Sequence, residues 1–282
     1  MARRRVLLSR YTSLQVGGRA EFFAEPTTVD QAVELVEDAL KRGLRLRFLG
    51  GGTNLLVDDV GVKGLVISTR NLRGLEGLWA MAGTPLPALL RQLARKRLSG
   101  LECLSGIPGT IGGAAVGNAG TRFGTIGSRI EAVRVVRGGK VVEIKELRFD
   151  YRSSSLGDDL VLGVKLRLEE QDPERILKAM ERARSQRNDP VGRSAGCIFR
   201  NPPTGPSAGE LIEGAGFKGA RVGGARVSRV HANWILCESG ATAEDVARLI
   251  GRIRERLPQL SLEVKVWSDR DEFLELCHEK RD

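Results

Sequence analysis

The chain has 282 residues, of which 41% are hydrophobic and 28% charged, so wholesale disorder is excluded and about two domains are expected. Its 35 glycines stand in clusters without a Gly-x-y period, which excludes collagen and indicates special backbone turns. The formal charge of +10 suits nucleic acid, anionic lipid or a phosphate-bearing small molecule.

The distribution of residue types narrows the class of protein further. Basic residues are spread along the chain without a long block interleaved with aromatics, which argues against nucleic acid. No apolar run approaches 18 residues and the first residues are too polar for a signal peptide, so we expect a cytoplasmic protein without membrane contact. The 4 cysteines form no C-x-x-C pair and there are only 2 histidines, His231 and His278, so no metal site is expected.

The first half of the chain predicts two helices and several short strands. Thr28 and Gln31 have the spacing of a capping box, and an apolar stripe follows them up to Gly43. The predicted helices cover residues 26–43 and 86–98, and the predicted strands cover 44–49, 55–57 and 65–68.

The second half intermixes strands and helices in the same way. Gly138-Gly139 predicts a hairpin turn, Asp172-Pro173 a helix start and Asn188-Asp189-Pro190 a domain boundary. Because the elements have no regular βαβ rhythm, the fold class is predicted to be α+β. The strands are expected at 132–137, 140–144, 159–169, 230–237 and 262–267, and the helices at 172–187, from Ser207 onward, and at 242–257.

Two glycine-rich segments are candidate anion cradles. The first, Gly50 to Asn54, follows a strand, but no Gly-Lys-Ser/Thr follows it and Leu55 stands where a Rossmann fingerprint needs glycine. The second runs from Ser105 to Gly120 almost without charge. Backbone N–H groups at glycines approach a diphosphate closely. Tight turns or close packing of elements are the alternatives, whereas two cradles together predict one dinucleotide held between two lobes.

Other motifs are weaker. Gly192 to Gly196 matches G-x-S-x-G, but the flanking residues are not the strand and helix of a hydrolase elbow. Arg152 stands in a hydroxyl-rich loop, where its planar fork suits a carboxylate and where a solvated arginine is the alternative. His231, Asn233 and Glu263 fit ordinary alternating strand residues as well.

Taken in order, these segments resemble the UDP-N-acetylenolpyruvoylglucosamine reductase family over nearly the whole chain. The first half carries Gly17-Gly18-Arg19-Ala20, Leu49 through Leu56, Gly106-Ile107-Pro108-Gly109-Thr110-Ile111-Gly112-Gly113 and Asn118-Ala119-Gly120. The second half carries Tyr151-Arg152-x-Ser154, Ala195 through Pro202, Gly216-Phe217-Lys218-Gly219, Val230 through Trp234 and Glu263-Val264-Lys265.

The resemblance implies a fold and a domain organisation. The fold is the two-lobed FAD-binding type of the vanillyl-alcohol-oxidase-like flavoproteins, with a small α+β substrate-binding domain. We expect FAD-binding lobe 1 at 1–68, joined by 257–282, lobe 2 at 69–186 and the substrate domain at 187–256. The short distance from Arg152 to Cys197 indicates the subtype without a tyrosine-bearing insertion.

The resemblance also implies an activity: reduction of the enolpyruvyl ether of UDP-N-acetylglucosamine-enolpyruvate to UDP-N-acetylmuramate in peptidoglycan synthesis. It implies FAD as cofactor, NADPH as co-substrate and no obligate protein partner. We expect the FAD to be non-covalent, because both histidines lie late in the chain and Cys103 lies in an apolar segment. Another oxidoreductase of the same fold, or a non-catalytic flavin or nucleotide module, is the alternative.

Matching the family motifs residue by residue assigns the site. The catalytic residues are Arg152, Cys197 and Glu263, where Cys197 replaces the family's usual proton-donating serine. The cofactor-binding residues are Gly50, Gly51, Gly52, Thr53, Asn54, Leu55, Gly106, Pro108, Gly109, Thr110, Gly112, Gly113, Asn118, Ala119 and Gly120. The substrate-binding residues are Tyr151, Asn201, Lys218, His231 and Asn233.

Overall fold

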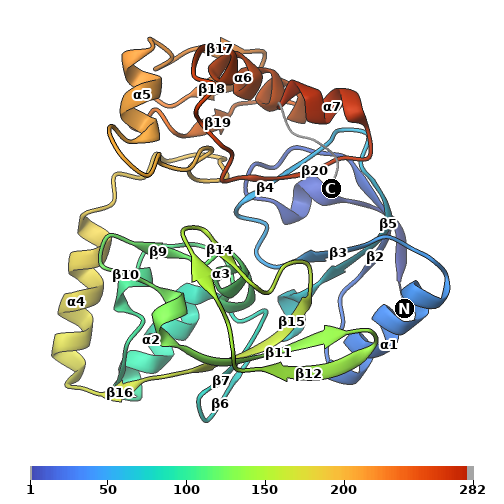
Figure 1. Ribbon diagram of the computed structural model, residues 1–282, viewed down its shortest axis with the longest axis vertical. Helices are drawn as coiled ribbons and strands as arrows, with labels where there is room; N and C mark the ends of the chain where they lie inside the picture. The colour runs from blue at the N-terminus through green and yellow to red at the C-terminus, as the bar shows by residue number, and fades with distance from the viewer. Residues whose placement is uncertain (1, 278–282) are drawn as a thin grey trace. The chain divides into compact units, whose positions relative to one another are not determined.

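The computed structural model describes residues 2–277, so His278 and the outermost ends of the expected domains lie outside the described residues. The chain forms two compact units (Figure 1). Unit 1 comprises the residues up to Arg3, Phe23–Gly51 and Gly64–Arg187, and unit 2 comprises Arg4–Phe22, Gly52–Lys63 and the residues from Asn188 on. The expected division into two lobes and a substrate domain stays a prediction.

The central sheet of unit 1 is antiparallel, with strand order β12-β11-β15-β7-β6 (Figure 1). Gly138 and Gly139 have φ values of +57° and +76°, as the tight turn between β11 and β12 requires. Helices α2 and α3 bury Leu89, Leu93 and Ile111 in the same hydrophobic core as the sheet. These elements are β6 (Leu75–Glu76), β7 (Trp79–Met81), α2 (Leu86–Arg95), α3 (Ile111–Val116), β11 (Ile130–Arg137), β12 (Lys140–Ile144) and β15 (Leu160–Leu166).

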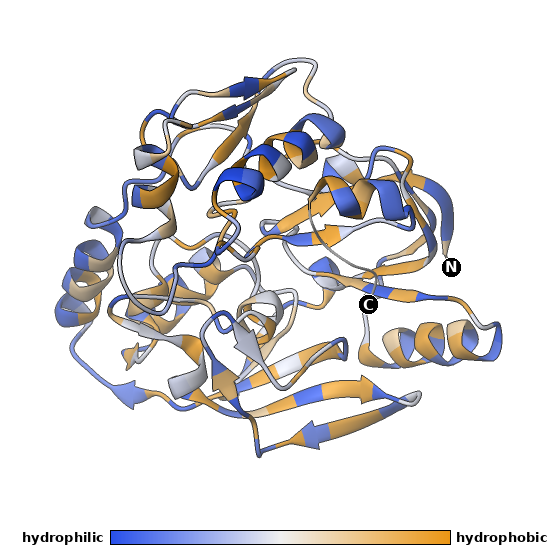
Figure 2. Ribbon diagram, turned by 45° about the horizontal axis from the view of Figure 1, so that its top comes forward, coloured by the Kyte–Doolittle hydropathy of each residue, from blue (hydrophilic) through white to orange (hydrophobic). Residues whose placement is uncertain are grey.

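The remaining elements of unit 1 are short or lie outside that sheet. Helix α1 begins after Thr28, whose side chain accepts from the Gln31 N–H at 3.2 Å, and α4 begins after the N-cap Asp172. Figure 2 shows hydrophobic residues interspersed with hydrophilic ones along the helices, the pattern of helices that bury one side. The elements are α1 (Val29–Lys41), β3 (Leu46–Leu49), β8 (Leu98–Ser99), β9 (Gly120–Thr121), β10 (Gly124–Thr125), β13 (Phe149–Asp150), β14 (Ser153–Ser154), β16 (Glu169–Glu170) and α4 (Pro173–Ser185).

One sheet has the order β1-β2-β5-β3, and the boundaries between the units fall within three of its strands. Strand β3 pairs with β5 in parallel, with Leu46 opposite Leu65. The other strands are β1 (Arg3–Leu7), β2 (Arg19–Ala24) and β5 (Val62–Ser68).

Unit 2 packs a three-stranded sheet and three helices around a core that contains Phe199, Ile212, Val246, Ile250 and Phe273. Helices α5 and α6 both begin with a reciprocal capping box. The elements are β4 (Leu55–Val57), α5 (Ala208–Gly214), β17 (Arg221–Val222), β18 (Ala225–Val227), β19 (Ile235–Cys237), α6 (Ala243–Arg256), β20 (Lys265–Trp267) and α7 (Asp271–Leu276).

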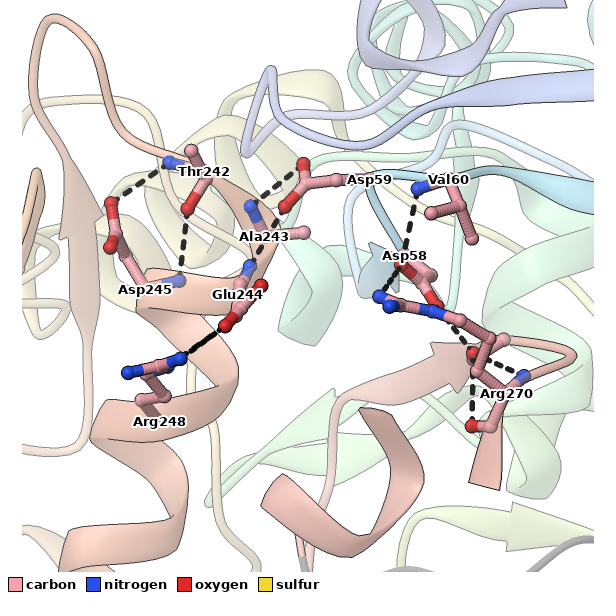
Figure 3. A network of polar contacts seen from close by, with 10 residues as sticks. Asp58, Asp59, Val60, Thr242, Ala243, Glu244, Asp245, Arg248 and Arg270 are labelled. Carbon is pink, nitrogen blue, oxygen red and sulfur yellow. Dashed lines mark hydrogen bonds and ion pairs between the residues drawn. The ribbon is translucent and has the colours of Figure 1, made fainter. Parts of the chain in front are cut away.

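Two neighbouring aspartates tie the segment after β4 to the C-terminal part of unit 2 (Figure 3). The fully buried Asp58 accepts from both Nε (2.9 Å) and Nη2 (2.7 Å) of Arg270 and from the Ser268 hydroxyl at 2.6 Å. The Asp59 carboxylate accepts the first two N–H groups of α6, from Ala243 and Glu244, each at 3.0 Å. A carboxylate at a helix N-terminus also interacts favourably with the helix dipole.

The mixed arrangement of helices and strands confirms the α+β fold class. Several predicted strands are too long. Residues 230–237 form a strand only from Ile235, since residues 231–234 form a turn, residues 262–267 form one only from Lys265, and the strand predicted at 159–169 ends at Leu166. Within residues 2–277, no helix has both the length and the apolar character that crossing a membrane requires.

Candidate active site

The two glycine-rich segments meet in unit 1. A Cβ added to Gly51 would stand 2.7 Å from the Gly109 Cα, and one added to Gly50 would stand 2.7 Å from the Thr110 Oγ1. The second segment is itself fixed, because Leu86 N–H donates to the Gly109 carbonyl at 2.9 Å. A side chain at position 51 would therefore push the two backbones apart, and one at position 50 would displace the Thr110 hydroxyl.

This junction fits an anionic diphosphate such as that of FAD. Among the described residues, the backbone N–H groups of Gly50, Gly51 and Thr110 have no protein acceptor within hydrogen-bond distance. Thr110 also caps the short helix α3, where its Oγ1 accepts from Gly113 N–H at 3.4 Å. Space is left beside Gly113, since a Cβ there would meet nothing nearer than 3.6 Å. Exposed N–H donors on glycine backbone are the usual partners of phosphate oxygens.

Packing alone accounts for three other glycines of the predicted cofactor set. A Cβ on Gly52, whose φ is +64°, would lie 2.0 Å from the Tyr11 carbonyl oxygen. A Cβ added to Gly112 would lie 2.8 Å from the Ala82 Cβ. One added to Gly120 would lie 2.5 Å from the Gly124 carbonyl oxygen. Close packing of elements, the alternative explanation of the glycine clusters, thus holds at these positions.

The other predicted cofactor residues differ in burial and in hydrogen bonding. Asn118 is 4% exposed, donates through Nδ2 to the Asp150 carbonyl at 2.8 Å and accepts from Gly127 N–H at 3.0 Å. Asn54, in unit 2, is exposed and donates to the Glu263 carbonyl at 3.0 Å. The rest comprise exposed Gly106 and Pro108, half-buried Thr53 and Ala119, and Leu55, which is buried in β4.

Arg152 occupies the second position of the two-residue turn between β13 and β14. Its φ is +56°, in the left-handed region that costs an arginine on the order of 1–3 kcal/mol. The turn is fixed from both sides: Asn118 holds the Asp150 carbonyl, and Ser154 Oγ donates to the Val116 carbonyl at 2.9 Å. The guanidinium carbon lies 5.1 Å from the ring centre of Tyr151, which is 49% exposed. Strained backbone of this kind concentrates at functional sites.

Cys197 and Glu263 lie in two backbone segments that pair with each other in unit 2. Glu263 N–H donates to the Ile198 carbonyl at 2.8 Å, and Phe199 forms an antiparallel bridge with Leu262. Cys197 is half-buried and follows Gly196, whose φ is +82°. Two backbone segments far apart in sequence, one carrying a thiol and the other a carboxyl group, are thereby brought side by side.

The predicted substrate residues of unit 2 differ in how their side chains are engaged. Asn201 Oδ1 accepts from Ala208 N–H, at the start of α5, at 3.0 Å. Lys218 Nζ pairs with Glu213 Oε1 at 2.7 Å. Burial lowers the pKa of His231, whose Nδ1 accepts from Asn233 N–H at 3.3 Å, so the neutral ring is favoured. The Asn233 side chain is 2% exposed and both its polar atoms are hydrogen-bonded to Phe199.

Arg200 is a residue that the sequence analysis did not single out. Its Nε is buried and has no hydrogen-bond partner among the described residues. A buried donor without an acceptor is unfavourable by about 1–3 kcal/mol, and an anionic ligand would relieve this. The only signal in the sequence was its position between Cys197 and Asn201. Because the chain has 35 arginines spread along its length, this position alone did not indicate a functional residue.

Two protein-family models match this chain, one in its N-terminal half and one in its C-terminal half. Residues 20–145 match the model for an FAD binding domain, and residues 186–267 match that for the C-terminal domain of UDP-N-acetylenolpyruvoylglucosamine reductase. The reductase of that name from Thermus thermophilus is 45% identical over 275 residues, covering 93% of this chain and 98% of the relative. That from Moorella thermoacetica is 43% identical and covers 93% and 92%, respectively.

A solved structure agrees with these matches. The crystal structure of UDP-N-acetylenolpyruvylglucosamine reductase from Thermus caldophilus is 43% identical, with a TM-score of 0.86, and the match covers 95% of this chain and 100% of that chain. The expected FAD-binding fold with its additional domain is confirmed. The chain belongs to the UDP-N-acetylenolpyruvoylglucosamine reductase family.

Proposed function

We propose that this protein uses NADPH to reduce the enolpyruvyl ether of UDP-N-acetylglucosamine-enolpyruvate to UDP-N-acetylmuramate, as an FAD-dependent enzyme of peptidoglycan synthesis. The relatives' names and the FAD binding domain support the proposal. The structural observation that carries it is the pairing of the Cys197 segment with the Glu263 segment. The pairing brings together two backbone segments, one of which carries a thiol and the other a carboxyl group.

FAD, when bound, supplies hydride transfer from NADPH to the vinyl carbon of the substrate. The donors that would hold its diphosphate are the backbone N–H groups of Gly50, Gly51 and Thr110. Arg152 orders the substrate carboxylate through its planar fork and stabilises negative charge that develops there. Glu263 helps to orient the same group, and Cys197 holds the proton that the α-carbon receives.

Four further residues are proposed to bind the nucleotide-sugar part of the substrate: Tyr151, Asn201, Lys218 and His231. Tyr151 is exposed beside Arg152, and Lys218 carries a positive charge suited to a diphosphate. The net charge of +10 favours ligands that all carry diphosphates. We propose a cytoplasmic location, with no nucleic acid, membrane or obligate protein partner.

The decisive experiment separates the two half-reactions under anaerobic conditions. NADPH should bleach the flavin absorbance of the purified protein, and the enolpyruvyl substrate should restore it with formation of UDP-N-acetylmuramate. Restoration by O₂ and not by this substrate would instead identify another oxidoreductase of the same fold. A protein whose colour NADPH does not bleach would be a flavin-binding module.

FAD is expected to be bound without a covalent bond. Within unit 1, Cys103 is the cysteine near the second glycine segment, and burial raises the pKa of its thiol, which disfavours the reactive thiolate. Acid precipitation should release all the yellow colour into the supernatant. Flavin that stays with the pellet after denaturation would contradict this.

Arg152→Lys should slow the substrate half-reaction by roughly 10²–10³-fold, the usual loss when one donor to a developing oxyanion is removed. Lysine keeps the charge but lacks the planar fork. The NADPH half-reaction should change little, and stopped-flow absorbance measures both. The control is Arg148→Lys, because Arg148 directly precedes strand β13 of the same hairpin. Equal slowing of both half-reactions would show that Arg152 acts structurally.

A further inference from the structure

The Asn233 side chain is engaged at both ends by the backbone of one residue. Its Oδ1 accepts from Phe199 N–H at 2.9 Å, and its Nδ2 donates to the Phe199 carbonyl at 2.7 Å. The Asn233 main chain adds a third bond to the same segment, because its carbonyl accepts from Ile198 N–H at 2.9 Å. With 2% of its surface exposed, Asn233 has little area left for a ligand.

These bonds fix the segment that carries Cys197. The next residue of the turn, Trp234, forms an antiparallel bridge with Cys197 itself. Residues 197–199 are thus held along residues 233–234 on one edge and along residues 262–264 on the other. An amide that pairs with both the N–H and the carbonyl of one residue acts like an additional strand partner.

We propose that Asn233 is a positioning residue for Cys197 and does not contact the substrate. The proposal rests on the proposed function, in which Cys197 delivers the proton. The amide keeps residues 197–199 in register, and this register sets where the thiol lies. A displacement of about 1 Å at a reacting group is enough to slow a reaction on the order of 10²-fold.

A double-mutant cycle tests this role. Asn233→Ala should slow the substrate half-reaction at saturating substrate by roughly 10–100-fold, with the NADPH half-reaction and the substrate affinity within about twofold of the unmodified protein. In a Cys197→Ala background, Asn233→Ala should slow the substrate half-reaction little further, since the effects of substituting residues that act as a unit are not additive. Ser268→Ala is the matched control, because it removes a buried hydroxyl of unit 2 outside this segment.

The Asn233→Asp variant adds a second measurement, the pH dependence of the rate. This dependence would not change if Asn233 had only a general structural role. An ionised carboxylate repels the Phe199 carbonyl, whereas a protonated carboxyl donates to it as the amide does. The rate of the Asp variant relative to the unmodified protein at the same pH should therefore rise as the pH is lowered from 8 to 5. The Ala variant should show no such recovery.

Alkylation of Cys197 by iodoacetamide, followed by mass spectrometry of its peptide, needs no substrate. The proposal predicts that the alkylation rate of Cys197 changes in Asn233→Ala and not in Ser268→Ala. An unmodified protein without activity on the enolpyruvyl substrate would refute the proposed function, while altered alkylation would still support the positioning. Weakened substrate binding with an unchanged saturated rate, or equal slowing with and without Cys197, would overturn the inference.

Discussion

Cys197→Ala should slow the substrate half-reaction by about 10²–10⁴-fold, the typical contribution of a general acid. Alanine has no proton to deliver, and the half-buried Cys197 lies in the segment paired with Glu263. Uptake of hydride from NADPH should be unaffected because it needs no acid at this position. Single-turnover measurements with the enolpyruvyl substrate, monitored by flavin absorbance, give the rate directly.

Cys197→Ser is the matched control for this prediction. A hydroxyl keeps the proton and nearly the same volume, so the serine variant should retain substantial activity. Cys237→Ala gives a second comparison, because the Cys237 thiol is 5% exposed and burial raises its pKa to about 11. An alanine variant at position 197 as fast as the unmodified protein would remove this residue from the mechanism.

Asp58→Asn should lower the free energy of unfolding by roughly 2–4 kcal/mol. Removing one partner of a buried ion pair costs about 3–5 kcal/mol. The loss is smaller here because the Arg270 side chain is 40% exposed, so water can hydrate its charge once Asp58 is replaced. Urea denaturation at neutral pH measures the difference. The control is Asp159→Asn. Its partner Arg137 is 56% exposed, so this substitution should lower the free energy of unfolding much less. Equal losses for the two variants would contradict the prediction.

The stabilisation by Asp58 should also depend on pH. Burial acts to raise the pKa of Asp58, but hydrogen bonds from Arg270, Ser268 and Val60 outweigh it, so the pKa lies below its ordinary value. A depressed carboxyl pKa stabilises the folded state fully above the ordinary value, and the stabilisation is lost as the pH falls through the folded value. The difference in free energy of unfolding between the unmodified protein and the Asp58→Asn variant should therefore become smaller below about pH 4.

The sequence predicted best what short-range chemistry determines. Thr28, Asp172 and Ser207 each cap the helix that their spacing indicated, and Gly138-Gly139 makes the expected hairpin. These elements depend on residues within four positions of each other. Local chemistry therefore suffices for their existence and type.

Contacts between residues far apart in sequence determine the features that the sequence did not predict. The alternating pattern of residues 230–237 indicated a strand, but the bonds of Asn233 to Phe199, 34 residues away, hold its first part as a turn. Glycine clusters likewise did not distinguish ligand cradles from close packing. What separates the two explanations is that the N–H groups of Gly50 and Gly51 have no protein acceptor among the described residues, whereas Gly52 is closely packed against Tyr11.

Unit 2 is assembled from three stretches of chain, and this bears on how the protein is synthesised. Asp58 and its partner Arg270 are 212 residues apart, with most of unit 1 translated between them. Domains commonly fold as they emerge from the ribosome, beginning at the N-terminus. Here Arg4–Phe22 and Gly52–Lys63 emerge early but cannot complete their unit until the residues from Asn188 through Arg270 have also been synthesised. A C-terminal fragment beginning at Asn188 would lack Asp58 and Asp59, so unit 2 cannot be made whole as one continuous piece.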